Sequence, residues 1–142
     1  MTWTQRFLAL ALHVAEWSKD PSTKVGAVVV DSDRIVLSLG YNGFPRGVID
    51  STERLSERPV KYAFTVHAEA NALLNASRSV RGATLYCTLL PCSECAKLVI
   101  QAGIRRVVCP APAEGYERWA DSFRMAREMF QESGVKLQVT HE

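Results

Sequence analysis

The sequence is short of the features that mark membrane or secreted proteins. None of its apolar runs approaches the roughly 20 residues needed to cross a bilayer, and no basic-then-apolar leader opens the chain. Only four cysteines occur in 142 residues. We therefore expect no membrane association, and a cytoplasmic protein in a reducing compartment that keeps its thiols free.

The net charge is also small, at +2. A protein that binds long nucleic acid usually carries a strongly basic face or helix, so this balance argues against such a partner but leaves small anionic ligands open. The middle of the chain mixes both signs of charge, and we expect most of its cations to be solvated surface groups: Lys24, Arg46, Arg54, Arg58 and Lys61.

What the chain does contain is enough apolar sequence for a core. A length of 142 residues with 47% apolar composition is that of one ordinary domain, so residues 1–142 are predicted to form a single domain. Cys87 and Cys109 lie inside apolar runs that are typical of buried strands, and they are predicted to be core thiols.

Hydrophobic periodicity predicts alternating strands and helices. Apolar residues at helical spacing from Phe7 to Trp17 predict a first helix that ends before Pro21 and covers a sheet. The segment from Gly40 to Phe64 is predicted to be long, irregular and functional. The remaining expected strands are 25–30, 34–39, 84–89, 106–109 and 135–139, and the remaining expected helices are 67–77, 91–102 and 117–133.

These elements together predict an α/β fold. The short connection between the first two strands favours an antiparallel hairpin, whereas the later strands are joined through helices, which favours parallel neighbours. The expectation is a three-layer α/β/α architecture, with a mixed five-stranded sheet, helices on both faces and the last two strands parallel.

Two short segments carry the chemistry: His67-Ala68-Glu69 and Pro91-Cys92-Ser93-Glu94-Cys95. One imidazole and two thiolates can hold three corners of a zinc tetrahedron and leave the fourth for water. Glu69 is then placed to move the protons of that water. Cys92 and Cys95 are three apart, on one side of the first turn of a helix, whereas His67 and Glu69 can share a site only at the open end of theirs.

Each motif has an ordinary interpretation when it stands alone. A lone H-x-E is very weak, and a lone C-x-x-C in an α/β chain could be a thioredoxin-like redox pair. The redox interpretation leaves His67 and Glu69 unexplained, and a closed structural zinc site would have to recruit Cys87 or Cys109. The combination therefore favours a catalytic zinc ion, one per chain. Asn42-Gly43, by contrast, is by default a turn dipeptide.

Four longer segments resemble the deoxycytidylate deaminase family: residues 20–27 (DPSTKVGA), 40–47 (GYNGFPRG), 67–72 (HAEANA) and 85–97 (LYCTLLPCSECAK). The zinc segments alone indicate the wider cytidine-deaminase-like superfamily. The resemblance implies the fold of that superfamily, and it implies that His67, Cys92 and Cys95 bind zinc. It also implies that the family reaction is the hydrolysis of dCMP to dUMP and ammonia, with Glu69 as the proton shuttle. It also implies substrate contacts from Asn42, Ala68, Lys24 and Tyr116.

The same resemblance implies homo-oligomers, with a hexamer favoured, and dCTP and dTTP as possible effectors. Other substrates remain open: a modified deoxycytidine nucleotide, a free nucleoside or base, or adenosine in tRNA, which the modest charge disfavours. A zinc or thiol interaction module without turnover is the alternative outside enzymes. It predicts bound metal or redox-active cysteines but no release of ammonia.

Overall fold

A five-stranded sheet runs through the centre of the molecule, in the order β2-β1-β3-β4-β5. The computed structural model describes residues 1–141. β1 pairs antiparallel with both β2 and β3, whereas β3, β4 and β5 are parallel. The predicted mixed sheet with a parallel last pair is therefore confirmed. The strands are β1 Gly26–Val30, β2 Val36–Tyr41, β3 Thr84–Cys87, β4 Arg106–Pro110 and β5 Lys136–Thr140.

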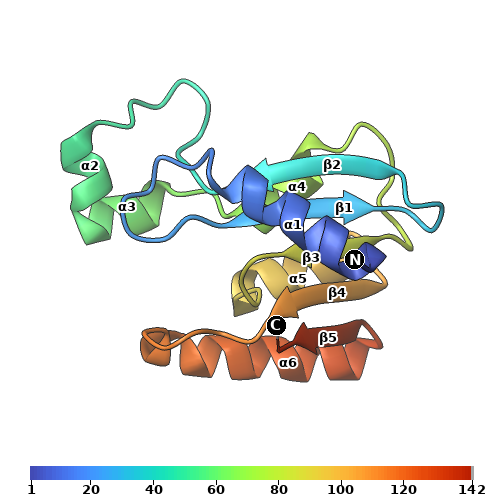
Figure 1. Ribbon diagram of the computed structural model, residues 1–142. Helices are drawn as coiled ribbons and strands as arrows, with labels where there is room; N and C mark the ends of the chain where they lie inside the picture. The colour runs from blue at the N-terminus through green and yellow to red at the C-terminus, as the bar shows by residue number, and fades with distance from the viewer. Residues whose placement is uncertain (142) are drawn as a thin grey trace.

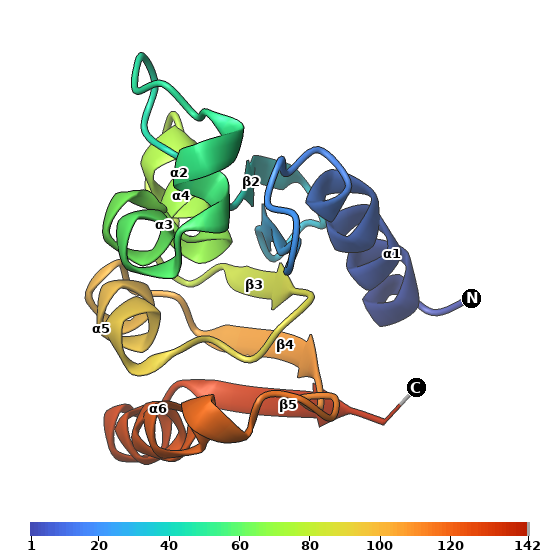
Figure 2. The same ribbon diagram turned by 90° about the vertical axis from the view of Figure 1, so that its left-hand side faces the viewer.

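Helices cover both faces of the sheet, as predicted (Figure 1). Figure 2 shows α1 alone on one face, with α4, α5 and α6 on the other. The strands alternate accordingly: Val28, Val30 and Val108 pack with α1, while Val29 and Val107 belong to the core beneath the other helices. The helices are α1 Trp3–Ala15, α2 Thr52–Ser56, α3 Arg58–Phe64, α4 Ala68–Asn75, α5 Ser93–Gln101 and α6 Ala120–Ser133, with a short 3-10 turn η1 Glu117–Trp119.

The ends of the helices follow local capping chemistry. α1 begins with a capping box between Thr2 and Gln5 and ends at Ala15, so Trp17 lies beyond the helix and is 50% exposed, although the periodicity placed it on the buried face. α6 ends at Gly134, which has a φ of 82°. That left-handed conformation strains any residue with a Cβ, which is why glycine stops the helix there.

The segment from Gly40 to Phe64 is more ordered than predicted. β2 continues to Tyr41, and α2 and α3 follow. The Ser51 side chain accepts a hydrogen bond from the Arg54 N–H and so caps α2, while Pro59 lies in the first turn of α3, where a missing N–H costs nothing. The prediction of an irregular segment was therefore wrong for α2 and α3, since proline is tolerated in the first turn of a helix.

No helix in residues 1–141 is both long enough and apolar enough to span a membrane.

Candidate active site

The amino end of α4 carries the first zinc segment. His67 is the N-cap residue, with extended backbone angles (φ −70°, ψ 155°), and Glu69 lies in the first helical turn. Because an N-cap residue is outside the helical geometry, the two side chains can turn toward one site although they are only two residues apart. The pair of backbone hydrogen bonds between Gly43 and Val66 holds the preceding residue against the loop after β2. The expected placement at a helix end is confirmed.

The amino end of α5 carries the second zinc segment. Cys92 is the N-cap and Cys95 lies in the first turn, so the helix starts two residues later than predicted. The Ser93 N–H, one of the helix's free amides, donates to the Ser122 hydroxyl at 2.8 Å. This bond joins α5 to α6 and fixes the turn that presents both sulfurs.

The three expected zinc donors come together. Nδ1 of His67 lies 3.5 Å from Sγ of Cys92 and 3.3 Å from Sγ of Cys95, and all three donor atoms lie within 4.8 Å of one another. Bonds of about 2.3 Å to sulfur and about 2.0 Å to nitrogen at a tetrahedral angle require a nitrogen-to-sulfur distance of about 3.5 Å. The donor set therefore fits zinc, and a set of three protein donors is typical of a catalytic ion.

The electrostatics of the thiols also favour a metal. The Cys95 side chain and then His67 lower the pKa of Cys92 to about 4, so Cys92 readily supplies a thiolate. Cys87 behaves differently, because Cys109 and burial hold its pKa well above the usual value. Both Cys87 and Cys109 are fully buried, which confirms them as core thiols.

Glu69 is buried beside this cluster, with 4% of its surface exposed. Burial raises its pKa to about 7, although the nearby His67 acts in the opposite direction. A carboxyl group with a pKa near neutrality can both accept and release a proton at physiological pH. This is the behaviour that a proton shuttle requires.

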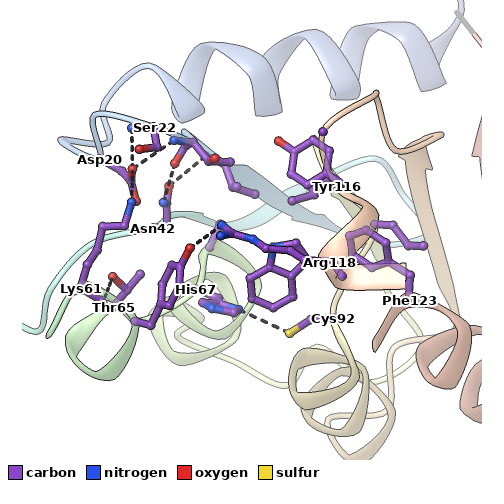
Figure 3. Close-up of a pocket in the computed structure, with 18 of the residues that line it drawn as sticks. Asp20, Ser22, Asn42, Lys61, Thr65, His67, Cys92, Tyr116, Arg118 and Phe123 are labelled. Carbon is purple, nitrogen blue, oxygen red and sulfur yellow. Dashed lines mark hydrogen bonds and ion pairs between the residues drawn. The ribbon is translucent and has the colours of Figure 1, made fainter. Parts of the chain in front are cut away.

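Above the cluster opens a cavity of about 430 Å³ (Figure 3). This volume lies within the range of small-molecule sites, roughly 300–1,000 Å³. Its wall includes His67, Glu69 and Cys92 together with residues of the loops after α1 and β4. The predicted contact residues Asn42, Ala68 and Tyr116 also line it. Lys24 does not: it is exposed and lies 4.0 Å from the Glu16 carboxylate, so its substrate contact stays a prediction.

Asn42 is buried and holds the loop between α1 and β1. Its Oδ1 accepts the Val25 N–H at 2.8 Å, its Nδ2 donates to the Thr23 carbonyl at 2.9 Å, and its own carbonyl accepts the Ser18 hydroxyl. The asparagine after β2 is therefore more than a turn residue. It fixes one wall of the cavity and still faces the cavity itself.

Lys61 is the residue whose environment the sequence interpretation missed. It was expected on the surface, but it is only 6% exposed and its ammonium lies 3.3 Å from Oδ1 of Asp20. The same oxygen accepts the backbone N–H groups of Ser22 and Thr23. The ion pair thus joins α3 to the loop that Asn42 also holds, and Figure 3 shows both groups at one end of the cavity.

A second group of side chains crosses the cavity from α3 to η1. The Arg118 guanidinium donates to the Tyr62 hydroxyl and lies 5.3 Å from the centre of the Tyr62 ring, and Tyr62 meets Trp119 edge to face. All three residues line the cavity, and Arg118 extends over it in Figure 3. With Arg58 and Lys61, Arg118 gives the wall a cationic character.

Comparison with known proteins agrees with this arrangement. Residues 1–111 match the family model described as the cytidine and deoxycytidylate deaminase zinc-binding region. The chain is 45% identical to an uncharacterized deaminase from the luxG 3′ region of Aliivibrio fischeri, over 95% of this chain and 91% of that protein. It is 40% identical to the human deoxycytidylate deaminase, over 95% of this chain and 78% of the relative.

Among solved structures, the chain is similar to the dCMP deaminase of cyanophage S-TIM5 in complex with dCMP and dUMP. The TM-score is 0.79 at 30% identity, and the match covers 99% of both chains.

Proposed function

The chain belongs to the cytidine and deoxycytidylate deaminase zinc-binding family, and from this premise we propose that it hydrolyses dCMP to dUMP and ammonia. The observation that carries the proposal is the buried Glu69 carboxyl beside a set of three zinc donors, at the base of a nucleotide-sized cavity. A zinc or thiol module without turnover has no use for a buried carboxyl that titrates near neutrality.

His67, Cys92 and Cys95 would hold the zinc ion. When bound, zinc supplies the Lewis acidity that makes water a nucleophile near neutral pH. Glu69 accepts the proton that water loses as its oxygen bonds to C4 of the base, and it delivers that proton to the ring nitrogen N3. The C4–N bond then breaks, and Glu69 passes the second proton of the water to the departing amine, which leaves as ammonia.

The cavity wall supports a substrate that carries a phosphate. Arg58, Lys61 and Arg118 line it, and Lys61 is already paired with Asp20. Arg118 and Arg58 have no acidic partner within ion-pair distance among residues 1–141. A guanidinium group matches the geometry of a phosphate, and Arg118 keeps donors beyond the one given to Tyr62. Asn42 and Ala68 are proposed to contact the sugar and base.

A substrate panel tests this proposal. The zinc-loaded protein is assayed for ammonia release with dCMP, deoxycytidine, cytosine and 5-modified dCMP. We expect kcat/KM for dCMP to exceed that for deoxycytidine by at least about 100-fold, since charged contacts to a phosphate are lost with the nucleoside. Comparable rates on dCMP and deoxycytidine would contradict the assignment of a nucleotide substrate. Faster turnover of the 5-modified dCMP would identify the modified nucleotide, and not dCMP, as the substrate.

The family resemblance also supports a homo-oligomer, with a hexamer favoured, and control by dCTP and dTTP. Several large apolar side chains remain exposed on the monomer and could be covered in such an assembly, among them Leu74 on α4, 77% exposed, and Ile49, 71% exposed. Light scattering of the purified chain gives the oligomeric mass, and assays with each triphosphate test regulation. A cytoplasmic location stays a prediction.

A further inference from the structure

A second cavity lies at the end of the sheet opposite the zinc site. Its volume is about 250 Å³, and its wall includes Trp3 at the start of α1, Arg34 in the β1–β2 hairpin, and Arg105 and Arg106 at the start of β4. The zinc donors lie beyond the other end of the sheet, where β3 leads into α5. In Figure 1 the start of α1 and the β1–β2 hairpin lie at the right-hand end of the strands, and α3 lies beyond their left-hand end.

The register of the strands brings cations together at this corner. Side chains alternate along a strand, so Thr84 and Arg106 project on the same face as Tyr86 and Val108, which pack with α1. Lys136 is the register partner of Arg106 and shares that face. The first turns of α1, with Trp3, Thr4 and Phe7, form the wall of the cavity next to this face.

The positive charge of this corner is not neutralised. Arg34, Arg105 and Arg106 line the cavity, and Arg6 lies 4.5 Å from the centre of the Trp3 ring. None of these four has an acidic partner within ion-pair distance among residues 1–141. The single acidic residue in the wall, Asp31, is already paired with Arg78 at 2.8 Å.

Two of the three arginines in the wall also make defined side-chain contacts. Arg106 donates to the Tyr86 hydroxyl at 2.9 Å and to Gln138 at 3.4 Å, while its Nε is buried and has no hydrogen-bond acceptor in the part of the chain described. Arg34 has a φ of 65°, and its guanidinium lies 4.8 Å from the centre of the Trp3 ring. A buried donor without an acceptor is costly, and guanidinium forks are suited to bidentate contact with phosphate oxygens.

We propose that this corner, defined by Arg34, Arg105 and Arg106, is a binding site for an oligophosphate. Three guanidinium groups without an acidic partner among residues 1–141 favour a ligand with several negative charges, which a single carboxylate does not supply. The volume of about 250 Å³ is below the roughly 300 Å³ at which small-molecule sites begin, so it suits a phosphate chain better than a whole nucleotide. Two ligands supply such a phosphate chain: free polyphosphate and the triphosphate tail of a nucleotide.

Calorimetry on the zinc-loaded chain tests the site, with saturating dUMP present to occupy the first cavity. We expect tripolyphosphate to bind, with an affinity that falls as salt is added, because the contacts are ionic. The double variant Arg34→Gln/Arg105→Gln should weaken binding by at least about tenfold. Arg46→Gln is the matched control: it removes an exposed arginine that contacts Asn75 elsewhere, and it should leave binding unchanged.

Two further ligands identify the source of the phosphate. Equal affinity for tripolyphosphate and a nucleoside triphosphate means that the site recognises the phosphate groups alone. Tighter binding of the nucleotide means that the site also contacts the nucleoside. No binding of tripolyphosphate at millimolar concentration, or equal binding by the double variant, overturns the proposal. Binding of a single-stranded oligonucleotide but not of tripolyphosphate overturns it in favour of a nucleic-acid surface. None of these measurements depends on turnover.

Discussion

Glu69 combines two properties that a surface carboxylate does not have: it is buried beside the zinc donors, and its pKa is about 7. Replacing it with glutamine keeps the shape of the side chain but removes the carboxyl group that accepts and releases a proton. We expect Glu69→Gln to retain zinc and fold normally while kcat falls by at least about 100-fold, the usual contribution of a positioned acid–base group. Zinc content and ammonia release, measured on the same sample, separate the two effects.

Glu114→Gln is the matched control, because Glu114 also lines the cavity but is exposed and lies on the loop after β4. It should turn over normally. Undiminished turnover by Glu69→Gln would remove this residue from the mechanism, and loss of zinc from it would show a ligand role instead.

The buried pair of Lys61 and Asp20 has a different role, since it holds the cavity wall together. Lys61→Met leaves the Asp20 carboxylate buried without its partner, and we expect the free energy of unfolding to fall by about 3 kcal/mol. Adding Asp20→Asn removes the stranded charge but keeps an oxygen for the Ser22 and Thr23 amides. The double variant should therefore lose less stability than the sum of the two single variants.

Urea unfolding measures these free energies. Lys97→Met is the control, because its pair with Glu94 is exposed, with side-chain exposures of 53% and 78%, and such pairs are worth about 0–1 kcal/mol. A cost for Lys61→Met no greater than that for Lys97→Met would mean that the buried pair contributes nothing beyond a surface one.

At the scale of elements, α4 is held so closely to β2 that only glycine fits between them. A Cβ on Gly40 would lie 2.3 Å from the Ala72 nitrogen and 2.4 Å from the Ala68 oxygen. Gly40→Ala must push α4 outward, and with it the His67 and Glu69 side chains. We expect a loss of about 1–3 kcal/mol in stability, together with weaker zinc binding.

Gly26→Ala provides the comparison on the other face. A Cβ there would lie 2.0 Å from the Ala11 oxygen in α1, which carries no zinc donor. We expect similar destabilisation but unchanged zinc affinity, measured by competition with a chelator. If both variants lose zinc equally, the spacing between α4 and β2 does not control the site.

The elements that the sequence predicts well are those with local signals. The main strands and the longer helices follow hydrophobic periodicity, and the zinc donors follow short spacings within two segments. α2 and α3 were missed because each is short, and polar residues and Pro59 hide a periodic pattern. The burial of Lys61 was missed because its partner is 41 residues away in the sequence. No local pattern reveals a contact of that range.

At the scale of the whole molecule, the zinc site joins two halves of the fold. His67 comes from the amino end of α4, which packs on β1 and β2, while both cysteines come from α5, which packs with α6. The donors lie within 4.8 Å of one another only when these parts are assembled. Zinc that binds this arrangement and not the unfolded chain must therefore stabilise the whole fold.

Removal of the metal tests that linkage. At free zinc about 100-fold above its dissociation constant, binding contributes about 2.7 kcal/mol, which for a chain of this size corresponds to roughly 10 °C in melting temperature. We expect a chelator to lower the melting temperature by that amount and added zinc to restore it. Cys92→Ala should show no zinc-dependent shift, whereas Glu69→Gln should show the full one. Equal melting temperatures with and without zinc in the unmodified chain would mean that the ion does not hold the two halves together.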